Sequence, residues 1–154
     1  MGILVRAAKS ADRSTIVDFQ MAMALETESL ELDKGVLALG VDAVLEDSSK
    51  ARYFIAEEGG KSAGMLMITL EWSDWRNGWV WWIQSVYTAP AYRKQGVYKQ
   101  LYEYIKSLVA ASDNIRGIRL YVDNRNVAAQ KVYRSLGMNG DHYTTYEWMP
   151  GDTQ

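Results

Sequence analysis

The residues with the clearest chemical potential form a short basic turn between an apolar strand and an amphipathic helix. The strand, residues 79–88, leads into Pro90, and the turn that follows contains Arg93, Lys94 and Gly96. The N–H groups at the start of a helix lack intrahelical acceptors, and the helix dipole makes that end positive. Gly96 has no Cβ, so a ligand can approach the main chain, and the two cations can contact phosphate oxygens. The pattern therefore predicts a site for a phosphorylated cofactor.

The composition excludes several other kinds of site. The 154 residues include no cysteine and a single histidine, His142. Disulfides, thiolate or His-rich metal sites and a thioacyl-enzyme on cysteine are therefore excluded, and a Ser-His-Asp triad is disfavoured. The net charge of −2 argues against a nucleic-acid partner, and no apolar run approaches the roughly 18 residues of a membrane helix. We expect no nucleic acid, no membrane and no metal as partners, and a cytoplasmic location.

The length and the hydrophobic content of 48% are typical of one globular domain, which we expect over residues 1–150 with a frayed tail at 151–154. Apolar periodicity and turn residues predict the elements that must position the basic turn. The expected helices are residues 10–29, 35–45, 94–111 and 126–136, the last ended by Gly137. The expected strands are residues 3–6, 52–57, 62–71, 79–88 and 118–122, with one or two more over 138–149. This order predicts a mixed α/β, or α+β, sheet.

Two blocks of the sequence resemble the GCN5-related N-acetyltransferase (GNAT) superfamily. The block from Arg93 to Tyr98 resembles the family's phosphate signature, Gln/Arg-x-x-Gly-x-Gly/Ala, except that Tyr98 replaces its last small residue. The block from Asn126 to Met138 resembles the family's Asn-x-x-Ala-x-x-x-Tyr segment followed by Leu-Gly-Met. Each block lies in the expected strand, turn and helix context, and the resemblance extends over nearly the whole chain.

The resemblance implies acetyl-CoA (coenzyme A) as cofactor and acetyl transfer to a primary amine. It also implies a twisted sheet of six to seven strands flanked by about four helices, with a β-bulge that separates two central strands around the pantetheine arm. Backbone groups of Val86, Tyr87 and Thr88 would pair with the pantetheine amides. The other implied cofactor-binding residues are Arg93, Lys94, Gln95, Gly96, Val97, Tyr98 and Lys99 at the pyrophosphate, and Asn126, Ala129 and Tyr133 near the thioester.

The implied chemistry needs a proton donor for the leaving thiolate and an acceptor for the amine's proton. A phenol with a pKa of about 10 keeps its proton at neutral pH, so Tyr133 is the candidate acid. Many relatives carry a glutamate just before the bulge, where this chain has Gln84. An amide cannot take up the proton but can orient a water, and a water chain ending on Glu26 or Glu28 is the hypothesis for the base. These three residues would also border the acceptor.

Five of the six tryptophans crowd the hairpin of residues 72–82. Such rings are typical of core and interface packing, here including a possible homodimer contact, but Trp72 and Trp75 are candidates for an aromatic wall around the acceptor. The leading hypothesis is an N-acetyltransferase that acts on a small-molecule amine by direct attack in a ternary complex. A protein or peptide N-acetyltransferase and a non-catalytic acyl-CoA-binding sensor module are the alternatives.

Overall fold

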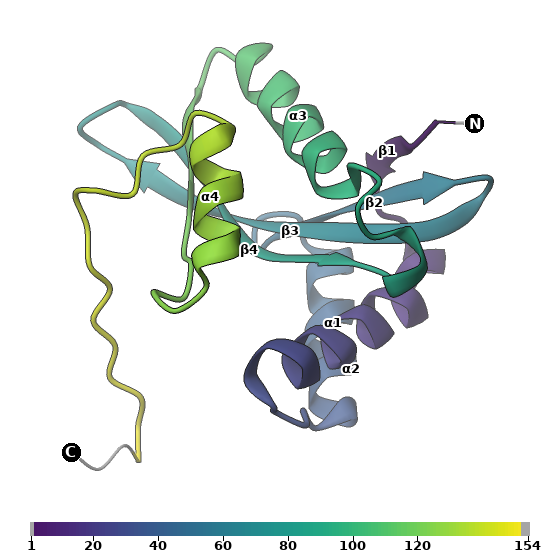
Figure 1. Cartoon of the computed structure of the whole chain (residues 1–154). Coiled ribbons are helices and arrows are strands. Elements are labelled where there is room, and N and C mark those ends of the chain that lie inside the picture. The colour runs from purple at the N-terminus through teal and green to yellow at the C-terminus, as the bar shows by residue number, and fades with distance from the viewer. Residues whose placement is uncertain (1, 152–154) are drawn as a thin grey trace. The chain divides into compact units, whose positions relative to one another are not determined.

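A five-stranded sheet in the order β1-β2-β3-β4-β5 organises the computed structural model, which describes residues 2–151 (Figure 1). The described residues belong to two compact units, one ending at Arg119 and one beginning at Leu120. The strands are β1 (Leu4–Ala7), β2 (Arg52–Glu58), β3 (Lys61–Ser73), β4 (Gly78–Thr88) and β5 (Ile115–Leu120). The helices are α1 (Arg13–Glu28), α2 (Lys34–Glu46), α3 (Val97–Ala110) and α4 (Val127–Ser135), with short 3₁₀ turns η1 (Ser10–Asp12) and η2 (Pro90–Tyr92).

The sheet is mixed in direction. Strands β1 to β4 pair antiparallel through short hairpins and the longer β1–β2 connection. Strands β4 and β5 run in the same direction. Near their starts the Trp79 N–H donates to the Asn114 carbonyl, and further along both strands the Arg119 guanidinium lies over the Trp82 ring. The predicted mixed α/β fold with about four helices is thus confirmed.

The expected count of six to seven strands is wrong, because the described residues 2–151 form five. Residues 138–149 adopt no regular secondary structure. The segment begins with turn-forming residues, and the Asp141 N–H donates to the Asn139 side chain over 2.9 Å, so a local turn replaces a strand ladder. Strand β5 begins at Ile115, three residues before the predicted strand 118–122. It starts earlier because Asn114 already accepts a hydrogen bond from β4.

Helices cover both faces of the sheet within the first unit, with α1 and α2 on one face and α3 on the other (Figure 1). Successive side chains of a strand point to opposite faces. Met65 of β3 accordingly packs with Ile16 and Val41 of α1 and α2, whereas its neighbour Leu66 is buried on the face of α3. Burying one such side chain stabilises the fold by about 1.5–3 kcal/mol, so these two apolar layers fix the sheet between the helices.

An ion-pair network holds the start of α1 against the edge of the sheet. The Arg6 guanidinium donates to both carboxylate oxygens of Asp12 over 2.7 and 2.8 Å, and also to Glu57 of β2. The hydrogen bonds from Arg6 lower the pKa of Asp12, which is buried. The network therefore sets the direction in which α1 leaves β1 and crosses the sheet.

The second unit contains α4 and the segment after it. The Asn126 side chain accepts a hydrogen bond from the Ala129 N–H over 3.0 Å and so caps the start of the helix. Gly137, with φ of 88°, ends it in the left-handed conformation, and the Met138 N–H returns to the Tyr133 carbonyl. The predicted helix 126–136 and its glycine cap are confirmed. Among residues 2–151, none of the helices combines the length and the apolar character needed to cross a bilayer.

Candidate functional site

A β-bulge interrupts β4 at Gln84. Met67 of β3 pairs with Ser85, but the next residue, Ile68, pairs with Ile83, so Gln84 has no partner across the ladder. The Gln84 amide donates to the Thr69 hydroxyl over 2.8 Å and remains exposed. A bulge bends its strand and increases the local twist, so the end of β4 is re-aimed from this point. The bulge that the family resemblance implied is present, with Gln84 in it rather than before it.

A buried polar contact fixes the residue that follows the bulge. Gln20 of α1 donates to the Ser85 hydroxyl over 3.0 Å, and both side chains are buried. Tyr53 of β2 lies beside them, and burial raises the pKa of its phenol. Because a buried polar group is costly without a partner, this contact ties α1 to β4 at one defined register.

Backbone contacts at the β3–β4 junction shape the basic turn that follows β4. A second bulge, at Ala63 of β3, leaves the Ala63 carbonyl to accept a hydrogen bond from the Ala89 N–H over 2.8 Å. Next to it, Gly64 permits a close approach, since a Cβ there would lie 2.6 Å from the Tyr87 carbonyl oxygen and 2.9 Å from Val97. The junction therefore holds β3, the end of β4 and the first residue of α3 together.

The turn enters α3 through two residues with positive φ, Lys94 at 63° and Gly96 at 80°. Gly96 is the residue before the helix, and no side chain caps α3 among the described residues. A Cβ built at Gly96 meets no atom within 4 Å, so the space at this end of the helix is open. The main-chain amides of the first helical turn, at Val97 and Lys99, point toward that end because of helix geometry. This arrangement fits a diphosphate, which the predicted cofactor carries.

Tyr98, the residue that departs from the family signature, packs along the helix. Its ring stacks on that of Tyr102, with the ring centroids 6.3 Å apart. The pair is separated by one helical turn, so the phenol extends along the side of α3 rather than across the helix start. The bulky residue is thereby accommodated without closing the space at Gly96.

Arg93 points to α1 and to the end of β4. Its guanidinium donates to both carboxylate oxygens of Glu26 over 3.1 Å and to the Thr88 carbonyl over 3.1 Å. It also lies over the Tyr87 ring, 5.7 Å from the ring centroid. Two residues predicted for different roles, Arg93 for the cofactor and Glu26 for the base, are thus brought together in one ion pair.

The other candidates for the acceptor side lie apart from this pair. Glu28 is the last residue of α1 and is exposed. Trp72 packs edge-on against Trp79 with the ring centroids 5.1 Å apart, whereas Trp75, in the turn between β3 and β4, is 92% exposed. Their roles at an acceptor remain predictions, as does the homodimer contact.

A carboxylate that is not among the predicted site residues lies on β3, three residues beyond the register shift at the bulge. Glu71 of β3 accepts hydrogen bonds from the Trp82 indole over 2.7 Å and from the Arg119 guanidinium over 2.9 Å. It is two residues from Thr69, the partner of Gln84, so both project from the same face of β3 about 7 Å apart. Spacing along the chain could not indicate the contacts of Glu71 with Trp82 and Arg119, because they depend on the register of neighbouring strands.

The cofactor candidates Asn126, Ala129 and Tyr133 belong to the second unit. Asn126 and Ala129 form the cap of α4, and Tyr133 lies one turn further along the helix. Their cofactor contacts and the acid role of Tyr133 stay predictions.

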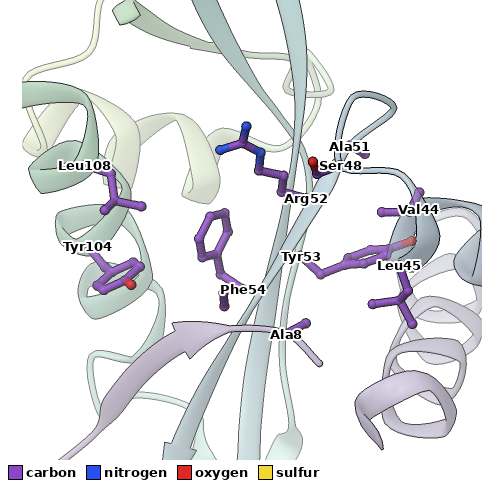
Figure 2. Close-up of a pocket in the computed structure, with 11 residues that line it drawn as sticks. Ala8, Val44, Leu45, Ser48, Ala51, Arg52, Tyr53, Phe54, Tyr104 and Leu108 are labelled. Atoms are coloured by element: carbon purple, nitrogen blue, oxygen red, sulfur yellow. The ribbon is translucent and has the colours of Figure 1, made fainter. Parts of the chain in front are cut away.

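A cavity of about 310 Å³ lies at the edge of the sheet, two strands away from β4. Figure 2 shows Phe54 on the side of Tyr104 and Leu108, and Tyr53 on the side of Val44 and Leu45. None of the predicted site residues lines it. Among the described residues that line it, Arg52 is the one cation and lies over the Trp81 ring, and none of them begins a helix. The cavity lacks the anion-binding chemistry of the turn, so we do not assign the cofactor to it.

Comparison with known proteins agrees with this geometry. The model of the family described as acetyltransferase (GNAT) matches residues 19–138. The crystal structure of a possible acetyltransferase from Clostridium difficile 630 is 43% identical, with a TM-score of 0.90 over 96% of this chain and 97% of that chain.

More distant structures share the fold alone. The aminoglycoside N-acetyltransferase AAC(6')-Iy, solved in complex with CoA, is 14% identical, with a TM-score of 0.78 over 97% of this chain and 95% of that one. The ribosomal-protein-alanine N-acetyltransferase from Brucella melitensis biovar Abortus 2308 is 12% identical, with a TM-score of 0.76 over 96% and 99%. A search of curated proteins found no match.

Proposed function

Because the chain belongs to the GNAT acetyltransferase family, we propose that it transfers the acetyl group of acetyl-CoA to a primary amine of a small molecule. The observation that carries this proposal is the bulge at Gln84, followed within one short turn by an open, uncapped helix start at Gly96. A strand bent by a bulge for the pantetheine arm, followed by main-chain amides for the diphosphate, is an arrangement that suits this cofactor. The CoA bound to the related AAC(6')-Iy supports the choice of cofactor.

When bound, acetyl-CoA supplies an activated acyl group, which moves from sulfur to the amine nitrogen as one C–N bond forms and one C–S bond breaks. The chain must then bind the diphosphate, hold the thioester and move two protons. We assign the diphosphate to the amides of Val97 and Lys99 with Lys94 nearby, and the pantetheine to the backbone of residues 86–88. The amine nitrogen loses one proton before it attacks and a second as the amide forms, and the departing thiolate receives one from Tyr133, which regains it from solvent.

For the proton of the amine we propose a water oriented by Gln84, which passes the proton toward Glu71. An alkyl ammonium has a pKa of about 10.4 and must be deprotonated before attack. Gln84 is exposed at the bulge, and Glu71 lies on the same face two residues beyond its hydrogen-bond partner Thr69. Glu71 is held by Arg119, and Glu26, the earlier candidate, is likewise held by Arg93, so the position of Glu71 on the strand opposite the bulge is the reason for the choice.

Calorimetric titration with acetyl-CoA, combined with a thiol-release assay over a panel of amines, tests the proposal. We expect saturable binding and CoA release that depends on the amine. Binding without any amine-dependent release would favour the sensor module, which the amide at the bulge in place of a carboxylate makes the second candidate. Release with peptides but not with small amines would favour the protein N-acetyltransferase.

Replacing Tyr133 by phenylalanine tests the acid role. We expect kcat to fall by about 100-fold, since general acid catalysis typically contributes 10²–10⁴-fold, whereas KM for acetyl-CoA changes little. The ring is retained, so packing within α4 is preserved. An unchanged kcat would remove Tyr133 from the chemistry.

A further inference from the structure

Arg93 is the first cation of the basic turn, yet three contacts direct its side chain away from the helix start. Its Nε donates to the Thr88 carbonyl, one terminal nitrogen donates to both oxygens of Glu26, and its plane lies over the Tyr87 ring. A guanidinium that is planar and held by a carbonyl, a carboxylate and a ring has a defined position and orientation.

The contacts of Arg93 join segments that are far apart in the sequence. Glu26 lies in the last turn of α1, which ends at Glu28, and Ser29 then turns the chain with a φ of 51°. Arg93 follows η2 and precedes the two positive-φ residues that lead into α3. The ion pair therefore links the C-terminal end of one helix to the turn that begins another, 67 residues later.

An aromatic base supports this link. Tyr87 is buried, and its ring packs against that of Phe19 in α1 with the centroids 5.2 Å apart. Burial, together with the Glu26 carboxylate, raises the pKa of the Tyr87 phenol, so the ring stays neutral beneath the guanidinium. The cation thus rests on a ring that is itself fixed between β4 and α1.

We propose that Arg93 and Glu26 form a clamp that positions the turn for the diphosphate and couples it to the end of α1, and that Arg93 is a positioning residue rather than a phosphate ligand. This inference rests on the proposed function. The backbone of the turn is secured at its start by the hydrogen bond from Ala89 to Ala63 and at its end by α3. Between these points Arg93 ties the turn to another element, so its loss leaves the amides less preorganised.

The clamp predicts a distinctive pattern of affinities in a double-mutant cycle. We expect Arg93→Met and Glu26→Gln each to raise the Kd for acetyl-CoA by about three- to tenfold, and the double variant to be no weaker than the more affected single variant. A phosphate ligand would behave differently. In that case Arg93→Met would weaken binding, whereas Glu26→Gln would leave the affinity unchanged or increase it. An unchanged or increased affinity in Glu26→Gln therefore overturns the clamp.

Arg93→Lys separates charge from geometry. Lysine keeps the positive charge but cannot donate to Thr88 and to both oxygens of Glu26 at once. We expect it to bind acetyl-CoA as weakly as Arg93→Met, and wild-type affinity in Arg93→Lys would contradict the clamp. The matched control is the exposed pair between Arg13 of α1 and Asp42 of α2, whose Arg13→Met and Asp42→Asn variants should leave the Kd unchanged.

A measurement without ligand distinguishes failure of the clamp from failure of the proposed function. In the unliganded protein, hydrogen–deuterium exchange should rise in residues 24–29 and in residues 88–96 for either single variant, because each breaks the same link. Thermal unfolding should change by no more than about 2–4 °C, since the pair is exposed. Faster exchange confined to the segment that carries the substitution overturns the clamp, whether or not acetyl-CoA binds.

Discussion

At the scale of single residues, the site depends on positions where the main chain adopts a left-handed conformation or packs closely against a neighbouring segment. Gly96 and Lys94 have positive φ, and the space above Gly96 is open. Gly64 lies against the carbonyl of Tyr87 and the side chain of Val97, which are the end of β4 and the start of α3. Backbone shape at these positions, more than side-chain chemistry, prepares the amides for an anion.

Gly64→Ala tests this dependence on backbone shape. Its Cβ would lie 2.6 Å from a main-chain oxygen, which cannot move without shifting the junction. We expect a loss of about 1–3 kcal/mol in the free energy of unfolding, as for other overpacked sites, and weaker binding of acetyl-CoA. Denaturant unfolding and calorimetry measure both. Gly117→Ala in β5 is the control, since a Cβ there meets nothing within 4 Å; equal behaviour of the two variants would contradict the prediction.

Some site residues could be predicted from the sequence and others could not. Gly96, Lys94 and Gln84 were found because the turn and the family motif are continuous in the chain. The contact of Arg93 with Glu26, and the contacts of Glu71 with Trp82 and Arg119, were missed because they depend on how elements pack. Spacing within one strand or helix carries no information about a register across two strands.

At the scale of elements, two β-bulges determine the shape of the basic turn and of the strand that leads into it. The one at Gln84 re-aims the end of β4, and the one at Ala63 supplies the carbonyl that holds the start of the turn. Hydrophobic alternation predicts neither bulge, because Gln84 and Ser85 form a polar pair within an apolar run and Ala63 stands at the start of one. The strands themselves were predictable from those same runs.

Deletion of Gln84 tests the role of the bulge. Without it, Ser85 would follow Ile83 and continue the ladder with Met67 and Ile68 in regular alternation. We expect the variant to fold with an unchanged circular dichroism spectrum but to bind acetyl-CoA at least about tenfold more weakly, since the strand is no longer bent. Gln84→Ala keeps the bulge and should retain the affinity. Full affinity in the deletion variant would show that the bulge is not needed.

Asp12→Asn tests the network that orients α1. Arg6 lowers the pKa of Asp12 in the folded protein below its ordinary 3.8, so the charged pair contributes stability above about pH 4. This contribution is lost as the pH falls through the lowered pKa. We expect Asp12→Asn to cost about 1–3 kcal/mol at pH 7, with the difference from the wild type shrinking below pH 4. Asp42→Asn, in an exposed pair, should change stability much less. A difference independent of pH would contradict this assignment.

At the scale of the whole molecule, the order of elements was sufficient to predict a mixed sheet, and the family resemblance implied the helices that flank it. The tail was the main error, because apolar residues over 138–149 suggested strands where Asn139 and Asp141 form a turn. The interpretation of residues 1–150 as one domain stays a prediction, as do the contacts of Tyr133 with the cofactor. Composition limited the chemistry from the start, since a chain without cysteine cannot form a thioacyl-enzyme on cysteine.

Calorimetry with two ligands tests the central claim most directly, namely that the helix start at Gly96 binds a diphosphate. The ligands are acetyl-CoA and acetyl-pantetheine, which has the same thioester arm but lacks the diphosphate together with the 3′-phosphoadenosine attached to it. We expect acetyl-CoA to bind at least about tenfold more tightly, and the advantage to shrink as the salt concentration rises. Equal affinity for the two ligands would contradict the account.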